Sequence, residues 1–301
     1  MAEPLHRVVV TGASGFVGSA LRPRLPASVN TLAFGAPDWE PRLASCHLED
    51  ATIFHLAGRA HAFDGDESAF ERDNAFKSRA LAQAAVREGA RRIVFLSTIK
   101  VYGEQSGDRA FTPEDPANPQ DAYARSKLAA EEALTQVARD SSLEVTIVRS
   151  PLVYGPGARA NLEALLQLAD SPWPLPFASL VAPRSFVHVD DLARVLVAAA
   201  ESPMAKGKTY IAVHCEGATT RSVVASMRRH LGRPTRLWPM SPAMLEGLAT
   251  IAGQRARALR LTRPLLGDPT TAERELGWSA RVSIDDAVEE LVRDYRARKQ
   301  P

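Results

Sequence analysis

The sequence predicts an α/β protein in which a parallel sheet, covered by helices on both faces, is joined to a smaller, mostly helical C-terminal lobe. Short β-branched runs alternate with stretches of helical periodicity over the first half of the chain, and this alternation is typical of parallel strands joined by crossover helices. A glycine-rich turn follows the first of these runs. After Tyr154 the alternation ends, and prolines separate short helical pieces.

The expected elements follow in chain order. Arg7–Thr11 (RVVVT) is a continuous apolar run, as expected of a strand buried on both faces, and a short helix should begin at Phe16. The further expected strands cover 29–34, 52–57, 92–97 and 144–149, and the longer helices cover 68–88, 122–140 and 161–169. The segment between Phe34 and Thr52 is too short for a full strand-and-helix unit, so we expect the third strand to be trimmed or vestigial.

These elements predict a division of the chain. Residues 1–155 should form a dinucleotide-binding domain, to which 184–215 return. Residues 156–183 and 216–301 should form the substrate lobe.

Composition sets limits on function. The 301 residues carry a formal net charge of only +2, with 45% hydrophobic and 24% charged residues, so we expect a globular protein with no nucleic-acid partner. Two cysteines form neither a disulfide framework nor a metal-ligand pattern, and we expect no metal. Met1–Pro4 carry no basic region before an apolar run, and no stretch is apolar enough to span a membrane. We therefore expect a cytoplasmic protein with no membrane partner.

The turn TGASGFVG places Gly12, Gly15 and Gly18 between a strand and a helix. In dinucleotide-binding folds the first glycine permits the tight turn, the second lets the backbone approach a pyrophosphate, and the third allows close helix–strand packing. The N–H groups at the start of the helix favour phosphate. The context therefore predicts a doubly wound, Rossmann-type sheet that binds a dinucleotide.

At the adenosine end of this site the sequence departs from the usual dinucleotide-binding pattern. Ala33 and Phe34 stand where an acid usually binds the ribose 2′-hydroxyl. We expect an open, partly apolar site in which Phe34 packs on the adenine, and in which NAD and NADP are only weakly discriminated. The alternative is that Asp38, in the following loop, supplies the acid.

Tyr123 and Lys127 lie one turn apart on the same face of a predicted helix. Ser97 and Thr98 end a strand at the edge where ligands bind in such sheets. A phenol, an ammonium group and a hydroxyl are the groups that hydride chemistry at a carbinol carbon needs. Because the phenol's ordinary pKa is near 10, we expect Lys127 and an oxidised nicotinamide to lower it. Tyr123 would then exchange the proton, Thr98 would hydrogen-bond the reacting oxygen, and Lys127 would also bond the nicotinamide ribose.

At this point the chain resembles a known family, the extended short-chain dehydrogenase/reductases of the NAD-dependent epimerase/dehydratase type. The motifs that carry the resemblance occur in family order over nearly the whole chain: TGASGFVG at 11–18, HLAG at 55–58, STIKVYGE at 97–104, YARSK at 123–127, SPLVYGPG at 150–157 and RSFVHVDDLA at 184–193.

The resemblance implies roles for particular residues. The implied catalytic set is Thr98, Tyr123 and Lys127. The implied cofactor-binding residues, besides Ser97, Tyr123 and Lys127, are Gly12, Gly15, Phe16, Val17, Gly18, Leu56, Ala57, Gly58, Pro151 and Val153. The implied substrate contacts are Thr98, Lys100, Asn161 and Arg184. It also implies a nucleotide-sugar substrate, NAD or NADP as cofactor, and a homodimer through the helices at 68–88 and 122–140.

The resemblance also narrows the reaction. Related dehydratases and decarboxylases carry acidic residues just after the catalytic hydroxyl, where this chain has Ile99 and Lys100. We therefore expect oxidoreduction at C4 of a UDP-hexose in polysaccharide precursor synthesis, by a 4-keto reductase or by a 4-epimerase similar to UDP-glucose 4-epimerase. Two alternatives stay open, a non-catalytic dinucleotide sensor and a reductase of a non-nucleotide ketone. The latter is favoured if Arg184 points away from the cleft.

Overall fold

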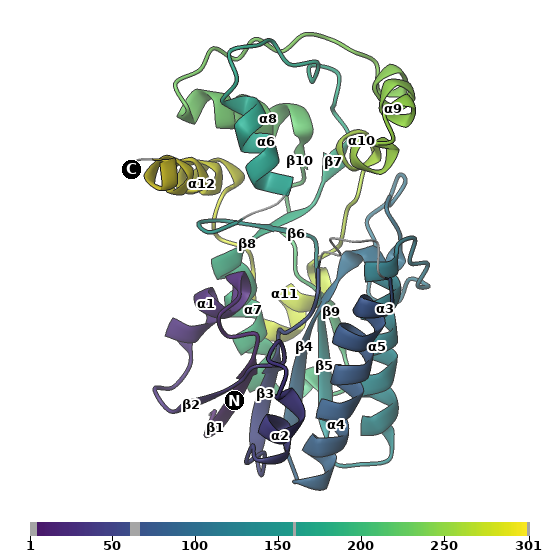
Figure 1. Ribbon diagram of the computed structural model, residues 1–301, viewed down its shortest axis with the longest axis vertical. Coiled ribbons are helices and arrows are strands. Elements are labelled where there is room, and N and C mark those ends of the chain that lie inside the picture. Colours follow the sequence, from purple (N-terminus) through teal and green to yellow (C-terminus); the bar gives the residue numbers. More distant parts are fainter. Residues whose placement is uncertain (1–4, 61–66, 159–160, 300–301) are drawn as a thin grey trace.

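The computed structural model describes residues 5–60, 67–158 and 161–299. Met1–Pro4, on which the expected absence of a leader rested, lie outside this range. Figure 1 shows a lower part built around a sheet and an upper lobe made mainly of helices. No helix in the described ranges is long and apolar enough to cross a membrane.

Six parallel strands form the sheet, in the order β2-β1-β3-β4-β5-β9. Their bounds are β1 Arg7–Thr11, β2 Val29–Leu32, β3 Ala51–His55, β4 Arg92–Thr98, β5 Glu144–Ser150 and β9 Thr209–Ile211. Within the described residues no strand pairs with the outer side of β2. A full doubly wound sheet would have one more strand, following β2 in the chain and pairing with its outer side. The expectation that this strand is trimmed is therefore confirmed, and only the short helix α2 (Trp39–Ala44) lies between β2 and the next strand, β3.

The inner strands β1, β3, β4 and β5 are buried on both faces almost throughout, which is why they form the middle layer of the lower part. Val9, Ile53, Phe95 and Ile147 belong to a core on one face, with residues of the helices α4 (Lys77–Arg87) and α5 (Ala122–Arg139). The alternate residues of the same strands face α1 (Phe16–Leu21) and α7 (Val189–Glu201) in a second core. The predicted helix at 68–88 is present as three consecutive segments, α3 (Glu67–Phe70), η2 (Glu71–Phe76) and α4.

The upper lobe has its own apolar core. Leu166, Val224, Met227 and Leu291 are among its fully buried residues. They come from α6 (Asn161–Ala169), α8 (Thr220–His230) and α12 (Ile284–Lys299). The other helices of this region are α9 (Pro242–Ile251) and α10 (Arg255–Thr262).

Short elements connect the two parts. Two small ladders pair β6 (Leu152–Tyr154) with β8 (Phe186–His188), and β7 (Pro183–Arg184) with β10 (Ala218–Thr219). Single turns occur at η1 (Arg22–Arg24), η3 (Ile99–Tyr102) and η4 (Pro203–Ala205).

One segment departs from the expected division. The helix α11 (Thr270–Leu276) packs on α7 and β9 in the lower part, where Ala272 and Trp278 join the core under the sheet. We keep the division as a proposal, with α11 assigned to the dinucleotide-binding part.

Candidate active site

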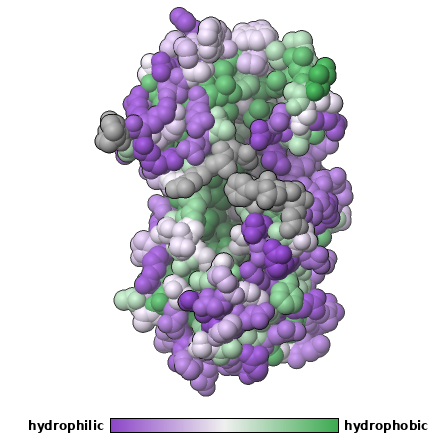
Figure 2. Space-filling view, in the orientation of Figure 1, coloured by the Kyte–Doolittle hydropathy of each residue, from purple (hydrophilic) through white to green (hydrophobic). Residues whose placement is uncertain are grey.

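The expected site residues come from the carboxyl ends of parallel strands, which meet at one edge of the sheet. The glycine turn follows β1, Leu56–Gly58 follow β3, Thr98 ends β4, and Pro151 follows β5. In Figure 1 this edge faces the upper lobe, and Figure 2 shows the hydrophilic and hydrophobic residues around the waist between the two parts.

At two positions of the turn only glycine fits, because a side chain would collide with neighbouring backbone atoms. Gly12 has a φ of +74°, and a Cβ there would lie 2.7 Å from the backbone nitrogen of Ala57. A Cβ on Gly18 would lie 2.3 Å from the carbonyl oxygen of Gly12. A side chain at Gly12 would push the turn away from Leu56 and Ala57, and one at Gly18 would push α1 away from the turn. Gly12 thus permits the tight turn and Gly18 the close helix packing of a pyrophosphate-binding cradle, so the residues present fit the expected cofactor.

The segment Leu56–Gly58 that follows β3, which we call the cofactor strip, reaches the predicted catalytic lysine, Lys127. A Cβ on Gly58 would lie 3.7 Å from Nζ of Lys127 and 3.0 Å from Oδ1 of Asn74. Asn74 in turn donates from Nδ2 to the Ser126 hydroxyl at 2.8 Å. The predicted cofactor strip and the helix α5 are thus held together beside Lys127.

A buried histidine fixes the start of that strip. The Ser78 hydroxyl donates to the carbonyl of Asn74 at 2.5 Å, so it accepts from Nε2 of His55 at 2.8 Å. Nδ1 of His55 then accepts from the Thr11 hydroxyl at 2.7 Å. Burial lowers the pKa of His55 to about 3. This neutral histidine therefore links β1, β3 and α4.

Thr98, Tyr123 and Lys127 are brought together. The helix α5 begins where the Asp121 side chain accepts from the backbone N–H of Ala124 at 2.7 Å, which presents Tyr123 in the first turn. Burial, together with the charge of Asp121, raises the pKa of Tyr123 to about 12, although a hydrogen bond with Thr98 acts in the opposite direction. Our expectation of a lowered pKa is therefore wrong for the protein's own residues, because burial of the phenol dominates.

Lys127 is buried against an aromatic ring. Its Nζ lies 3.9 Å from the centre of the Phe95 ring. Burial lowers the pKa of Lys127 to about 7, and the charge of Glu131 opposes this. Burying the charged form therefore makes Lys127 a much weaker base than a lysine in water.

A buried ion pair lies behind Lys127. Glu131 accepts from Nε of Arg149 at 3.1 Å and from Nη2 at 2.5 Å, and Arg149 also donates to the Tyr102 hydroxyl. The Ser97 hydroxyl donates to Glu131. Because the proton of that hydroxyl is engaged, its oxygen is left to a cofactor as a hydrogen-bond acceptor only, and the expected contact stays a prediction. Sequence reasoning missed Glu131, although its position one turn after Lys127 was a usable signal.

Lys100 is paired with carboxylates. Its Nζ forms ion pairs with Asp121 and with Oε1 of Glu104, the latter at 2.6 Å. Arg260 of α10 lies within 4 Å of the same two carboxylates. A substrate contact by Lys100 would require exchange of one of these partners, and Asp121, Glu104 and Arg260 were not predicted.

Arg184 is a cation at the junction of the two parts. Its Nη1 donates to the carbonyl of Arg263 at 2.7 Å. Within the described ranges no carboxylate lies at ion-pair distance from it. Burial lowers the pKa of Arg184 to about 10, and the charge of Glu104 opposes this.

The remaining expected contacts are placed by their elements. Phe16 and Val17 begin α1, and Val153 lies in β6. Asn161 begins α6, but its side chain lies outside the described part of the chain.

The adenosine end differs from our expectation. Phe34 is only 3% exposed and packs edge-on against Trp39 and His55, so the prediction that its ring packs on an adenine is wrong. Asp38 forms an ion pair with Arg42 at 2.8 Å. The end of β2 is instead met by a group of three charged residues that sequence reasoning missed, Arg59, Asp73 and Lys77.

These residues form one connected cluster. Nζ of Lys77 donates to the carbonyl of Phe34 at 2.8 Å and pairs with Asp73 at the same distance. Nε of Arg59 pairs with Asp73 at 2.7 Å. The carboxylate is thus neutralised by two cations, which lower the pKa of Asp73 although its burial acts in the opposite direction.

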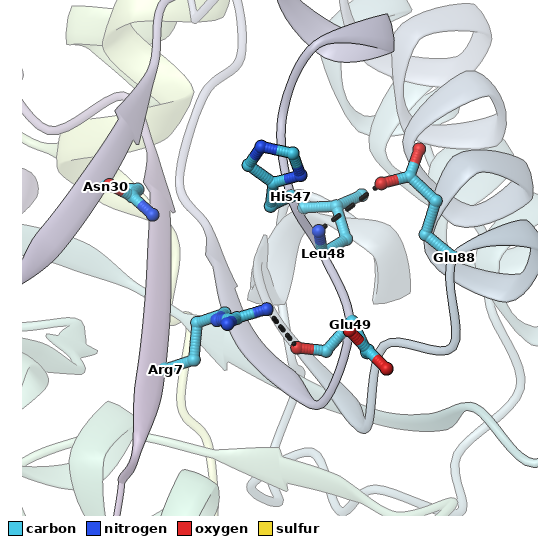
Figure 3. Close-up of a pocket in the computed structure, with 6 residues that line it drawn as sticks. All are labelled: Arg7, Asn30, His47, Leu48, Glu49 and Glu88. Carbon is cyan, nitrogen blue, oxygen red and sulfur yellow. Dashed lines mark hydrogen bonds between the residues drawn. The ribbon is translucent and has the colours of Figure 1, made fainter.

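A separate surface hollow lies at the other end of the strands (Figure 3). Arg7, at the start of β1, donates to the carbonyl of Glu49 at 2.9 Å, and Glu88 accepts from the backbone N–H of Leu48 at 3.3 Å. These contacts join loops at the amino ends of the strands, so the hollow is no part of the candidate site. Within the described ranges no group of His, Cys, Asp and Glu residues could hold a metal ion.

Comparison with known proteins adds independent findings. The family described as NAD dependent epimerase/dehydratase matches residues 43–212. UDP-glucose 4-epimerase of Vibrio cholerae is 29% identical, with 96% of this chain and 95% of the relative covered. Ceramide reductase of Caulobacter vibrioides is 31% identical, with 76% and 72% covered.

Solved structures show the same fold. UDP-glucuronic acid 4-epimerase from Bacillus cereus, in complex with NAD, has a TM-score of 0.77 at 19% identity, with 98% of this chain and 100% of that one covered. RMD from Pseudomonas aeruginosa, complexed with NADPH, has a TM-score of 0.77 at 20% identity, with 97% and 99% covered. The α/β architecture with its mostly helical C-terminal region is confirmed by this likeness.

Proposed function

The chain belongs to the NAD dependent epimerase/dehydratase family, and on that premise we propose that it catalyses NAD(P)-dependent oxidoreduction at C4 of a UDP-hexose, in polysaccharide precursor synthesis. The observation that carries the proposal is the gathering of Thr98, Tyr123 and Lys127 beside the Gly12–Gly18 cradle. The structural neighbours described as complexes hold NAD or NADPH, which supports one of these two as the cofactor.

Each residue of the site has a distinct role in the proposed reaction. A bound nicotinamide supplies or accepts the hydride. Tyr123 exchanges a proton with the C4 oxygen, and Thr98 hydrogen-bonds the same oxygen and orients the phenol. Lys127, beside Gly58, binds the ribose next to the nicotinamide and contributes positive charge. The Gly12–Gly18 backbone holds the pyrophosphate.

Reduction is our first candidate for the C4 reaction. In that direction the protonated phenol of Tyr123 donates to a ketone oxygen, and burial favours the protonated form. The exposed outer edge at β2 also suits a cofactor that exchanges after each turnover. A 4-epimerase is the second candidate, and the Vibrio cholerae relative favours it.

Dehydration and decarboxylation are not proposed. Ile99 is fully buried in an apolar cluster with Ile211 and Val213, and Lys100 is an ammonium held by two carboxylates. Neither side chain supplies the carboxylate that elimination of water or loss of carbon dioxide would use at these positions.

Reduction of a non-nucleotide ketone is the alternative that an observation favours. Ceramide reductase is among the relatives, and one nitrogen of Arg184 is turned to a backbone carbonyl instead of a free cleft. A non-catalytic dinucleotide sensor is disfavoured, because a sensor needs none of Thr98, Tyr123 and Lys127. We retain as proposals a homodimer through the helical segments at 68–88 and 122–140 and a cytoplasmic location.

One experiment separates these possibilities. The purified protein is incubated with UDP-sugars and UDP-4-keto-sugars, with and without added NADH or NADPH, while absorbance at the nicotinamide band and the product sugar are followed together. A reductase consumes reduced cofactor in proportion to product. An epimerase forms product with no net change in absorbance. No turnover of any nucleotide sugar, together with oxidation of NADPH by a long-chain ketone, would overturn the proposal in favour of the alternative.

A further inference from the structure

The helix α9 packs only loosely on the upper lobe, with Leu245 partly buried against its core. None of its residues is buried. Met244, Leu248 and Ile251 lie on one face at helical spacing, with 49%, 53% and 87% of their surfaces exposed. Figure 2 shows this region as a strongly hydrophobic area at the upper right, where Figure 1 places α9. An apolar helix face of this kind marks an interaction surface.

The charges around α9 are unevenly distributed. The one carboxylate of the helix, Glu246, is engaged by Arg263 at 2.8 Å and by the Thr262 hydroxyl at 2.6 Å. The next helix, α10, begins with the exposed Arg255 and Arg257. Within the described ranges no carboxylate lies at ion-pair distance from either of these two. The charge of Arg255 helps to lower the pKa of Glu246 without an ion-pair contact, and the excess charge next to the apolar helix face is positive.

The inner side of α10 belongs to the rim of the candidate active site. Its Arg260 lies 3.7 Å from Asp121, the residue that caps the helix carrying Tyr123, and 3.9 Å from Glu104. Because α9 packs on α10, a surface that contacts α9 is one helix away from this rim.

We propose that Met244, Leu248, Ile251, Arg255 and Arg257, which we call the apolar–basic face, dock the protein on an anionic lipid bilayer. The apolar side chains enter the boundary between headgroups and acyl chains, and the two guanidinium groups pair with lipid phosphates. Our expectation of no membrane partner rested on the lack of a spanning segment, which a surface contact does not require. The inference goes beyond the proposed function and does not depend on it.

Charge complementarity selects a bilayer over other occupants. A second copy of this chain would place the unpaired Arg255 and Arg257 opposite the same residues near a two-fold axis, where like charges repel. An anionic bilayer accepts the apolar row and the adjacent cations together. Each arginine near an anionic bilayer contributes about 1 kcal/mol to the free energy of binding, so the loss expected on removing two of them can be calculated.

The test uses the full chain and vesicle flotation. The protein is mixed with vesicles of phosphatidylcholine, or of phosphatidylcholine with about one third phosphatidylglycerol, and the bound fraction is measured. We expect binding to the anionic vesicles that weakens with salt. Arg255→Glu combined with Arg257→Glu should lower the partition coefficient by about thirtyfold or more, and Ile251→Glu by about tenfold or more.

Matched controls and outcomes complete the design. Met204→Glu alters an apolar residue of similar exposure (55%) in η4, and Arg22→Glu alters an exposed arginine in η1. Both should bind vesicles as the parent does. Failure of the parent to bind anionic vesicles, or equal loss in the controls, would overturn the proposal. So would a parent dimer, detected by light scattering, that Ile251→Glu converts to a monomer. Turnover of soluble UDP-sugars is measured separately and does not enter this test.

Discussion

Nζ of Lys127 lies 3.9 Å from the centre of the Phe95 ring, so the predicted catalytic ammonium sits over an apolar surface instead of in water. Phe95 belongs to the strand that ends at Thr98, and Lys127 follows Tyr123 by one helical turn. The core of the sheet therefore controls the charge of the active-site lysine. This relationship has consequences that can be measured.

The first prediction concerns stability and pH. The pKa of Lys127 is lowered to about 7 in the folded protein from 10.5 in the unfolded chain. Between these values the unfolded state binds more protons, so this group makes the free energy of unfolding rise with pH, by up to about 1.4 kcal/mol per pH unit. Lys127→Met should lack this contribution. Urea unfolding of both proteins from pH 6 to 9.5 checks it, and parallel curves would contradict it.

The second prediction tests the ion pair behind Lys127. Glu131→Gln leaves the buried Arg149 without its anionic partner, and should lower the free energy of unfolding by about 3–5 kcal/mol. Glu132→Gln, at the exposed neighbouring position, should change it by less than about 0.5 kcal/mol. Denaturant titration at neutral pH compares the two. Equal stabilities would show that Arg149 finds another acceptor.

The third prediction is catalytic. Tyr123→Phe removes the proton-exchanging oxygen with little change of volume, and should lower turnover by about a hundredfold or more. The Gly12–Gly18 cradle is untouched, so the affinity for cofactor should remain close to the parent's. Steady-state kinetics and calorimetric titration measure the two quantities. An active Tyr123→Phe protein would end the assignment of Tyr123 as the catalytic phenol.

The fourth prediction concerns the adenosine end. Among the residues that the structure describes, no free carboxylate lies at the end of β2, and the nearby Asp73 is paired with Lys77 and Arg59. Discrimination between NAD and NADP should therefore stay below about a hundredfold, or about 2.7 kcal/mol. Asp38→Ala should not alter it, because Asp38 pairs with Arg42. Titration with both cofactors decides. A preference for NAD above about a thousandfold that disappears in Asp38→Ala would refute this account.

The fifth prediction concerns the substrate phosphates. Arg184 has no carboxylate at ion-pair distance among the described residues, so its guanidinium can pair with a diphosphate. Arg184→Ala should weaken UDP binding by about 2–3 kcal/mol and leave cofactor affinity unchanged. Titration with UDP and with NAD measures both. Unchanged affinity for UDP would assign Arg184 to its hydrogen bond with the Arg263 carbonyl and would favour a non-nucleotide substrate.

The sequence by itself determined the features that depend on local spacing. The glycine turn, the pairing of Tyr123 with Lys127 on one helix face, and the continuous apolar strands all follow from residues a few positions apart. The geometry of a helix or a strand then fixes how such residues lie. The trimmed third strand was also predictable, because the chain between Phe34 and Thr52 is too short for more.

Only the tertiary structure decided features that join distant segments. Glu131 meets Arg149 across two elements, Lys77 reaches the Phe34 carbonyl at the end of β2, and Phe34 is enclosed by Trp39 and His55. The pKa of Tyr123 rises instead of falling because the packing around it removes water, which no spacing along the chain reveals. Similarly, apolar periodicity marks α9 as amphipathic, but only the arrangement of its neighbours leaves that face uncovered. Burial depends on which distant segments pack together in space, and a pattern of residues along the chain does not contain that information.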